Sequence, residues 1–238
     1  MTTRPATTFT TLRSALALAP TEQARCDNVH TLHSLVLAGI PAPMPSETDP
    51  EPRPQNVLFA AHRSAPLTDR QRHHVAARPE RVLVQAPARP DWQPLIDAGR
   101  LTSAHTFPVE HRVQADDIIG IKVIVSPVMR SVDTRKRLSL TAPHEAADWL
   151  QRHLSRAGLD TALGDITPGE RVRITGNRKG VPITVVCRDM AARSRVRDPE
   201  RLVQALTTGL GPSKAYGCGL LRIRLTDQNR GDKIVTVI

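Results

Sequence analysis

The chain has 238 residues, which allows one large or two small domains and excludes a mini-protein stabilised only by disulfides. Hydrophobic residues make up 39% and charged residues 24%, a balance that excludes a chain disordered throughout. No apolar run reaches the roughly 18 residues that a membrane span needs, and the first residues lack a signal-peptide pattern, so we expect a cytoplasmic protein with no membrane partner. Cys26, Cys187 and Cys218 are far apart and form no C-x-x-C pair, which argues against a disulfide framework or a thiolate zinc site.

The charge balance is strongly positive. Thirty-three Lys and Arg against 23 Asp and Glu leave a net charge of +10, as expected of a protein that binds a polyanion. Nucleic acid is the first candidate, although GC-rich genomes also favour arginine codons, so charge alone does not decide. Aromatic residues are only 3%, too few for an RNA-binding sheet that stacks bases on strand aromatics. Any recognition of nucleic acid would therefore depend on phosphates and shape.

The first half of the chain alternates strand and helix patterns. Asp27 is the expected N-cap of a helix, because Val29, Leu32, Val36 and Ile40 then fall on one helical face. The predicted elements, in chain order, are a strand at 9–18, a helix at 27–39, strands at 57–61 and 81–86, a short helix at 91–98 and an extended segment at 101–108. Between them, the Pro-rich segment 41–56 is predicted to be a loop and the basic stretch 69–78 a solvated loop or an insertion.

The second half repeats the same order. Its predicted elements are a strand at 118–125, a helix at 143–157, strands near 171–174 and 182–188, a helix at 199–207 and a strand at 219–225. Each half is therefore strand, helix, two strands, helix, strand, which is the order of a ferredoxin-like domain. We predict an α+β fold of two tandem ferredoxin-like (RRM-like) domains, residues 1–108 and 109–238, that meet in the polar segment 105–117.

A glycine-rich segment, Gly209–Leu221, lies between the last predicted helix and strand. Four glycines around Lys214 allow backbone N–H groups to approach an anion closely. The segment is neither a Walker loop nor a dinucleotide fingerprint, because the required Gly-Lys-Ser/Thr and third glycine are missing. The alternative is a turn whose glycines serve only tight packing of the helix on the strand.

These residues carry a resemblance to a known family. The pattern Gly-x-Gly-Pro-x-Lys-x-x-Gly-Cys-Gly-Leu-Leu is similar to the C-terminal signature of CRISPR repeat-processing endoribonucleases of the CasE type, found in type I-E Cascade. Three further matches follow the family's order, namely His30-Thr-Leu-His33, the strand 82–85 with Pro90-Asp-Trp92, and the strand 121–127 with the helix segment 147–152. The resemblance therefore extends over nearly the whole chain.

The resemblance implies a function. Members of this family cleave the hairpin of a CRISPR repeat without a metal or other cofactor, leaving a 2′,3′-cyclic phosphate and a 5′-hydroxyl. It further implies that the partners are the repeat RNA hairpin, the mature guide RNA and the other Cascade subunits, and that the free protein is a monomer. A non-catalytic RNA-binding subunit of the same complex is the alternative, and a generic structured-RNA binder is a more distant one.

The resemblance places the catalytic residues on the first helix. His33 interrupts the helix's apolar stripe and matches the catalytic histidine, while His30, one turn earlier, replaces a tyrosine of better-known relatives. Histidine can accept or donate a proton near neutral pH, so the pair suits in-line attack by a ribose 2′-OH. Without the resemblance, His33 would be interpreted as a hydrogen-bonded core histidine and His30 as a solvated one. Some relatives carry a lysine where this chain has Ala38, so another cation must then stabilise the transition state.

The predicted RNA-binding residues lie in the second half. Arg171 and Arg173 alternate with Val172 and Ile174 on a strand, so both charges lie on one of its faces. A turn with two further cations at its tip follows, although an ordinary solvated hairpin has the same pattern. The full set predicted to bind RNA is Lys122, Arg171, Arg173, Arg178, Lys179, Gly209, Gly211, Ser213, Lys214, Gly217 and Gly219. The remaining histidines and acids, His73, His74, His105, His111, Asp116 and Asp117, lack metal-ligand spacing, so no metal site is predicted.

Overall fold

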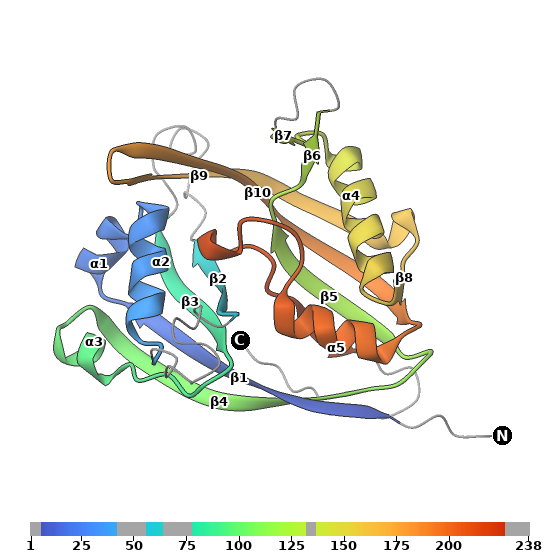
Figure 1. The fold of residues 1–238 in the computed structure, drawn as a ribbon, viewed down its shortest axis with the longest axis horizontal. Helices are drawn as coiled ribbons and strands as arrows, with labels where there is room; N and C mark the ends of the chain where they lie inside the picture. The colour runs from blue at the N-terminus through green and yellow to red at the C-terminus, as the bar shows by residue number, and fades with distance from the viewer. Residues whose placement is uncertain (1–5, 42–55, 64–77, 132–136, 227–238) are drawn as a thin grey trace, which may run out of the picture.

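The computed structural model describes residues 6–41, 56–63, 78–131 and 137–226 and shows two antiparallel sheets side by side (Figure 1). The loop predicted at 41–56 and the basic stretch 69–78 lie almost wholly outside the described residues. The first sheet has the strand order β2-β3-β1-β4. The elements of this half are β1 (Thr7–Leu18), α1 (Pro20–Arg25), α2 (Val29–Ala38), β2 (Leu58–Arg63), β3 (Pro79–Ala86), α3 (Gln93–Asp97) and β4 (Leu101–Val113).

The second sheet has the order β11-β5-β10-β8, and β9 also pairs with β10. Its elements are β5 (Ile118–Val125), α4 (Pro143–Arg156), β8 (Leu159–Asp160), the 3-10 turn η1 (Leu163–Asp165), β9 (Ile166–Arg178), β10 (Val181–Val196), α5 (Pro199–Thr208), the 3-10 turn η2 (Lys214–Tyr216) and β11 (Arg222–Leu225). A small ribbon of β6 (Val128–Arg130) and β7 (Arg137–Ser139) follows β5. In the first sheet the last strand, β4, lies beside the first, β1, and β3 lies between β1 and β2. In the second sheet β11 lies beside β5, and β10 lies between β5 and the strands β8 and β9. This is the ferredoxin-like order, so the predicted fold class is confirmed.

Three predicted boundaries differ from the structure. The helix at 27–39 begins at Val29 with Asn28 as its N-cap, instead of Asp27, because the Asn28 side chain accepts the N–H of His30. Pro20 does not merely end β1, since it occupies the first position of the short helix α1. The predicted domain boundary after residue 108 falls within β4, which pairs with β1 as far as Val113.

Each sheet has its own apolar core. In the first half, α2 buries Leu32, Leu35 and Val36 against β1, β3 and the side chains of α3. In the second half, α4 and α5 cover one face of the sheet, as Figure 1 shows, and bury Leu150 and Leu206 there. Both helices begin with a proline at their first turn, as their sequences predict.

A buried arginine joins the two sheets. Arg13 on β1 donates its Nε–H to the side chain of Gln85 at 3.2 Å and an Nη2–H to the carbonyl of Leu221 at 3.1 Å. Gln85 in turn donates to the carbonyl of Leu206 at the end of α5, at 2.7 Å. Burial, and then the charge of Arg222, lower the pKa of Arg13 to about 10, so the guanidinium remains charged at neutral pH. These bonds hold the first sheet, and therefore α2, against the second half of the chain.

Candidate active site

The two histidines lie together on α2. The His30 and His33 rings have centroids 6.2 Å apart, and both side chains are partly buried. They lie one turn apart at the edge of the helix's apolar face, whose buried residues are Val29, Leu32, Leu35 and Val36. His33 is therefore neither wholly in the core nor wholly in solvent.

The glycine-rich loop brings a third ring to this pair. η2 packs against α2, and the rings of Tyr216 and His33 meet edge to face with centroids 6.3 Å apart. Lys214, the first residue of η2, is partly buried. The predicted histidine pair and the predicted lysine loop, far apart in the sequence, are thus neighbours in the fold.

The glycines of the loop serve tight packing. Gly209, Gly211, Gly217 and Gly219 all have positive φ, between +68° and +89°. A Cβ at Gly211 would lie 2.5 Å from the ring of Trp149, and one at Gly219 would lie 2.5 Å from the carbonyl oxygen of Leu210. The N–H groups of Gly209, Gly217 and Gly219 donate to the carbonyls of Ala205, Lys214 and Ile124. The packing interpretation accounts for these glycines, and a part in anion binding remains a prediction for the loop, including Ser213, whose φ is +61°.

The tip of the β9–β10 hairpin reaches α2. Lys179 and Gly180, with φ of +50° and +84°, form the tight turn, and the N–H of Gly180 donates to the Asn177 side chain at 2.7 Å. Ile174 packs with buried Val29, so this face of β9 points to α2. Because side chains alternate along a strand, Arg178 belongs to the same face as Ile174.

The predicted basic hairpin is therefore divided between two faces. Arg171 and Arg173 belong to the face of β9 that points away from α2, whereas Arg178 belongs to the face that points towards it. All three side chains, and that of Lys179, are exposed. The predicted Lys122 is also exposed and lies on β5 opposite Ala191 and Arg222 of the neighbouring strands. Their role in RNA binding remains a prediction.

The surroundings of His33 favour its neutral form. Its pKa is lowered from the ordinary value of 6.5 by partial burial, then by the positive charge that His30 can carry, and then by that of Arg178. A histidine whose pKa lies below 6.5 is mostly unprotonated at neutral pH. His33 is therefore suited to accept a proton.

Sequence reasoning missed two residues of this site. Asn28 was overlooked in favour of Asp27, although Asn is as good an N-cap residue, and its second function depends on a contact with Asn177. Tyr216 was treated as part of the glycine pattern. Its signal was that it is the only tyrosine in the chain and that it lies beside Lys214 and the glycines.

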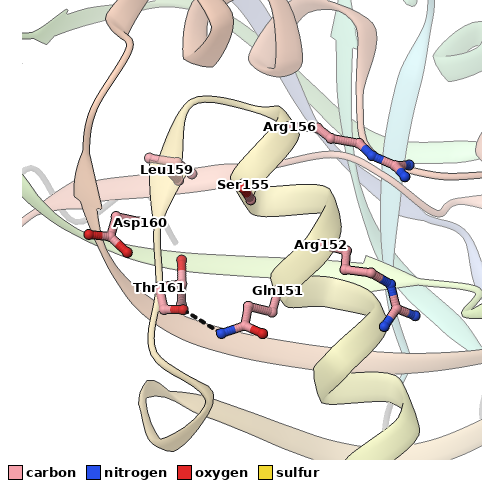
Figure 2. Close-up of a pocket in the computed structure, with 7 residues that line it drawn as sticks. All are labelled: Gln151, Arg152, Ser155, Arg156, Leu159, Asp160 and Thr161. Atoms are coloured by element: carbon pink, nitrogen blue, oxygen red, sulfur yellow. Dashed lines mark hydrogen bonds between the residues drawn. The ribbon is translucent and has the colours of Figure 1, made fainter.

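A separate hollow of about 410 Å³ lies between α4 and β8. Figure 2 shows its lining, in which the Gln151 side chain donates to the carbonyl of Thr161 at 2.9 Å. The lining residues are Gln151, Arg152, Ser155, Arg156, Leu159, Asp160 and Thr161. The hollow contains none of the predicted site residues. Among the described residues, no three His, Cys, Asp or Glu side chains gather as ligands for a metal ion, and no helix is long and apolar enough to cross a membrane.

Comparison with known proteins identifies the family of this chain. The model of a family described as CRISPR associated protein matches residues 12–224, which is most of the chain, so the chain belongs to this family. Two curated relatives are the CRISPR-associated endoribonuclease Cse3 of Thermus thermophilus and the CRISPR system Cascade subunit CasE of Escherichia coli. The first is 29% identical over 155 residues, covering 61% of this chain and 73% of the relative, and the second is 28% identical over 155 residues, covering 60% and 73%. The predicted resemblance to the CasE type is confirmed.

Solved structures agree as well. The chain is similar to the CRISPR endoribonuclease Cse3 bound to a 19-nucleotide RNA, with a TM-score of 0.70 and 25% identity over 90% of this chain and 99% of that one. It also shares the fold of Thermus thermophilus Cse3 bound to an RNA that represents a pre-cleavage complex. There the TM-score is 0.73 and the identity 24%, over 91% of this chain and 100% of that one.

Proposed function

We propose that this protein is a CRISPR repeat-specific endoribonuclease that cleaves precursor RNA within repeat hairpins without a metal ion, and that it stays bound to the product in Cascade. The observation that carries the proposal is His33, a histidine of lowered pKa that has His30 on one side and the glycine-rich loop on the other. The curated relatives support it, because one is named an endoribonuclease and the other a Cascade subunit.

The proposed reaction is an in-line transesterification. Neutral His33 takes the proton of the ribose 2′-OH, the 2′-oxygen bonds to phosphorus, and the bond from phosphorus to the 5′-oxygen breaks. The leaving 5′-oxygen receives a proton, so the products are a 2′,3′-cyclic phosphate and a 5′-hydroxyl. His30, whose ring centroid lies 6.2 Å from that of His33, acts as either the proton donor or a group that positions the phosphate.

A cation must stabilise the charge that builds up on the phosphorane. Ala38 occupies the position of the lysine that some relatives use. Arg178 and Lys214 replace it in this proposal, because the hairpin tip and η2 both lie against α2. Arg171, Arg173, Lys179 and Lys122 are assigned to the phosphates of the RNA stem, whose A-form shape is recognised mainly through the backbone.

The deciding experiment is incubation of the protein with the repeat RNA of its own genome in EDTA, followed by analysis of the RNA ends. Cleavage that continues in EDTA and yields a cyclic phosphate supports the proposal. A matched RNA with deoxyribose at the cut site must remain intact, because it lacks the attacking hydroxyl. Loss of activity on chelation, or cleavage of the deoxy substrate, contradicts the mechanism. Tight binding with no cleavage of either RNA favours the non-catalytic subunit.

A further inference from the structure

Asn28 joins the catalytic helix to the hairpin. Its side-chain oxygen accepts the N–H of His30 at 3.0 Å, as an N-cap does, and also accepts the backbone N–H of Asn177 at 3.2 Å. Its side-chain N–H donates to the backbone carbonyl of Asn177 at 3.3 Å. The side-chain amide of Asn28 thus bonds one N–H of the first turn of α2 and both backbone groups of Asn177 at the hairpin tip.

The packing beside this amide leaves no spare room. Val29 is fully buried against Ile174 and Val185 of the hairpin. A Cβ at Gly176 would lie 2.5 Å from the side-chain oxygen of Asn28 and 3.1 Å from the backbone nitrogen of Val29. Gly176 does not have a positive φ, so its backbone does not require glycine. Its missing side chain is what allows the hairpin to approach the helix.

The contact determines where Arg178 lies. Asn177 is fixed from both sides, because its backbone bonds Asn28 and its side chain accepts the N–H of Gly180 in the turn. Arg178 lies between these two anchored residues, and its charge reaches His33. We propose that Asn28 is a positioning residue, which docks the β9–β10 hairpin on α2 and thereby holds Arg178 beside His33.

This inference rests on the proposed function and adds a coupling to it. The hairpin carries most of the predicted RNA-binding cations, so the element that grips the RNA stem also supplies a cation to the catalytic site. A hairpin that leaves α2 would still bind phosphates through Arg171 and Arg173. The site on α2 would then lose Arg178 and keep only Lys214 of η2, so cleavage would slow while binding persisted.

Two substitutions undock the hairpin in different ways. Asn28→Ser keeps an N-cap residue of equal rank for α2 but removes the amide that bonds both backbone groups of Asn177. Gly176→Ala removes no polar group and places a methyl against Asn28. The matched control is Gly164→Ala, because Gly164 has no positive φ and its added Cβ meets nothing within 4 Å.

The first measurement is cleavage of repeat RNA under single-turnover conditions with saturating protein. Asn28→Ser and Gly176→Ala are expected to slow cleavage about 10- to 100-fold, the effect of a small misplacement of a catalytic group, and Gly164→Ala to leave it unchanged. In an Arg178→Ala background, Asn28→Ser should have little further effect, because the two residues act as one unit. Independent effects that multiply would overturn the assignment of Asn28 to Arg178.

The second measurement is the pH titration of His33 by NMR in the free protein. The groups that lower its pKa or contact its ring are His30 on α2, Arg178 on the hairpin and Tyr216 on η2, and the charged Lys214 also lies on η2. β9 and the hairpin tip carry the further charges Glu170, Arg171, Arg173 and Lys179. Of the two charges that lower the pKa of His33, undocking moves only Arg178, so this pKa should rise towards 6.5 in both variants and stay at its wild-type value in Gly164→Ala.

The outcomes separate the inference from the proposed function. Wild-type protein that leaves its repeat RNA intact defeats the proposed function, and the inference with it. Wild-type protein that cuts while Asn28→Ser and Gly176→Ala cut equally fast defeats the inference alone. An unchanged pKa of His33 in both variants also contradicts the inference, because it would mean that Arg178 stays beside His33 when its docking contact is lost.

Discussion

Gly219 in the glycine-rich loop gives the sharpest test of why the loop contains glycines. Replacing it by alanine should destabilise the protein for two reasons that add. Its φ of +89° lies where a side chain costs about 1–2 kcal/mol. The new Cβ would also lie 2.5 Å from the carbonyl oxygen of Leu210, a residue whose N–H bonds the carbonyl of Gly219 itself. Relief of that contact must move backbone, and overpacking of this kind costs about 1–3 kcal/mol.

The control separates the two causes. Gly99 also has a positive φ, +66°, but a Cβ there meets nothing within 4 Å. We expect Gly99→Ala to lower the free energy of unfolding by about 1–2 kcal/mol, and Gly219→Ala by about 2–5 kcal/mol. Urea denaturation followed by circular dichroism measures both. Equal losses for the two variants would show that the loop yields freely and that close packing is not what requires Gly219.

Three further predictions concern catalysis, binding and stability. His33→Ala should slow cleavage roughly 10²–10⁴-fold, as loss of a positioned proton acceptor does, while the affinity for the RNA hairpin in a filter-binding assay stays near wild type. A folded variant that cleaves at the wild-type rate would show that His33 is a packing residue. Arg173→Glu and Arg178→Glu should both weaken RNA binding and reduce the slope of log affinity against log salt concentration by about one. Only Arg178→Glu should also slow cleavage at saturating protein, because only Arg178 lies on the face of β9 towards His33. Equal cleavage rates for the two variants would contradict the division of the hairpin between two faces. Burial and then the charge of Arg13 lower the pKa of His111 to about 4. Between pH 6.5 and 4 the unfolded chain therefore binds a proton that the folded chain does not, and the free energy of unfolding decreases by up to about 3 kcal/mol as the pH is lowered over this range. Urea titrations at each pH should show a flatter dependence for His111→Gln.

The strand at 101–108 shows why polar sequence can hide a strand. The prediction ended at Pro108 because residues 105–117 are polar. In the structure β4 is the edge strand of its sheet and pairs with β1 alone, which is where a proline is tolerated in a sheet. Its polar residues find partners on β1, where His111 stacks on Phe9 and bonds Thr11 at 3.1 Å. Such partners depend on the register of the pairing, which no local pattern shows.

The lengths of the two hairpin strands, β9 and β10, were underestimated for a related reason. Strands were predicted near 171–174 and 182–188, whereas β9 and β10 run over Ile166–Arg178 and Val181–Val196. Pro182 lies in the part of β10 that pairs with β9 alone, so its other edge needs no N–H. By contrast, α4 and α5 were predicted well, because a helix carries its own signals: a proline at the first turn and an apolar face repeated every three or four residues.

The residues of the candidate site also divide into those marked by a local signal in the sequence and those placed only by tertiary packing. His33 could be singled out because it interrupts an apolar helical face, which is a local signal. What surrounds it, Arg178 and Tyr216, comes from a hairpin tip and a glycine turn that only tertiary packing brings to α2. Asn28 belongs to both levels: its N-cap role follows from the helix start, yet the same amide finds the backbone of Asn177 only once the hairpin has folded over the helix. A residue that satisfies a local rule can therefore carry a long-range function without leaving any additional trace in the sequence.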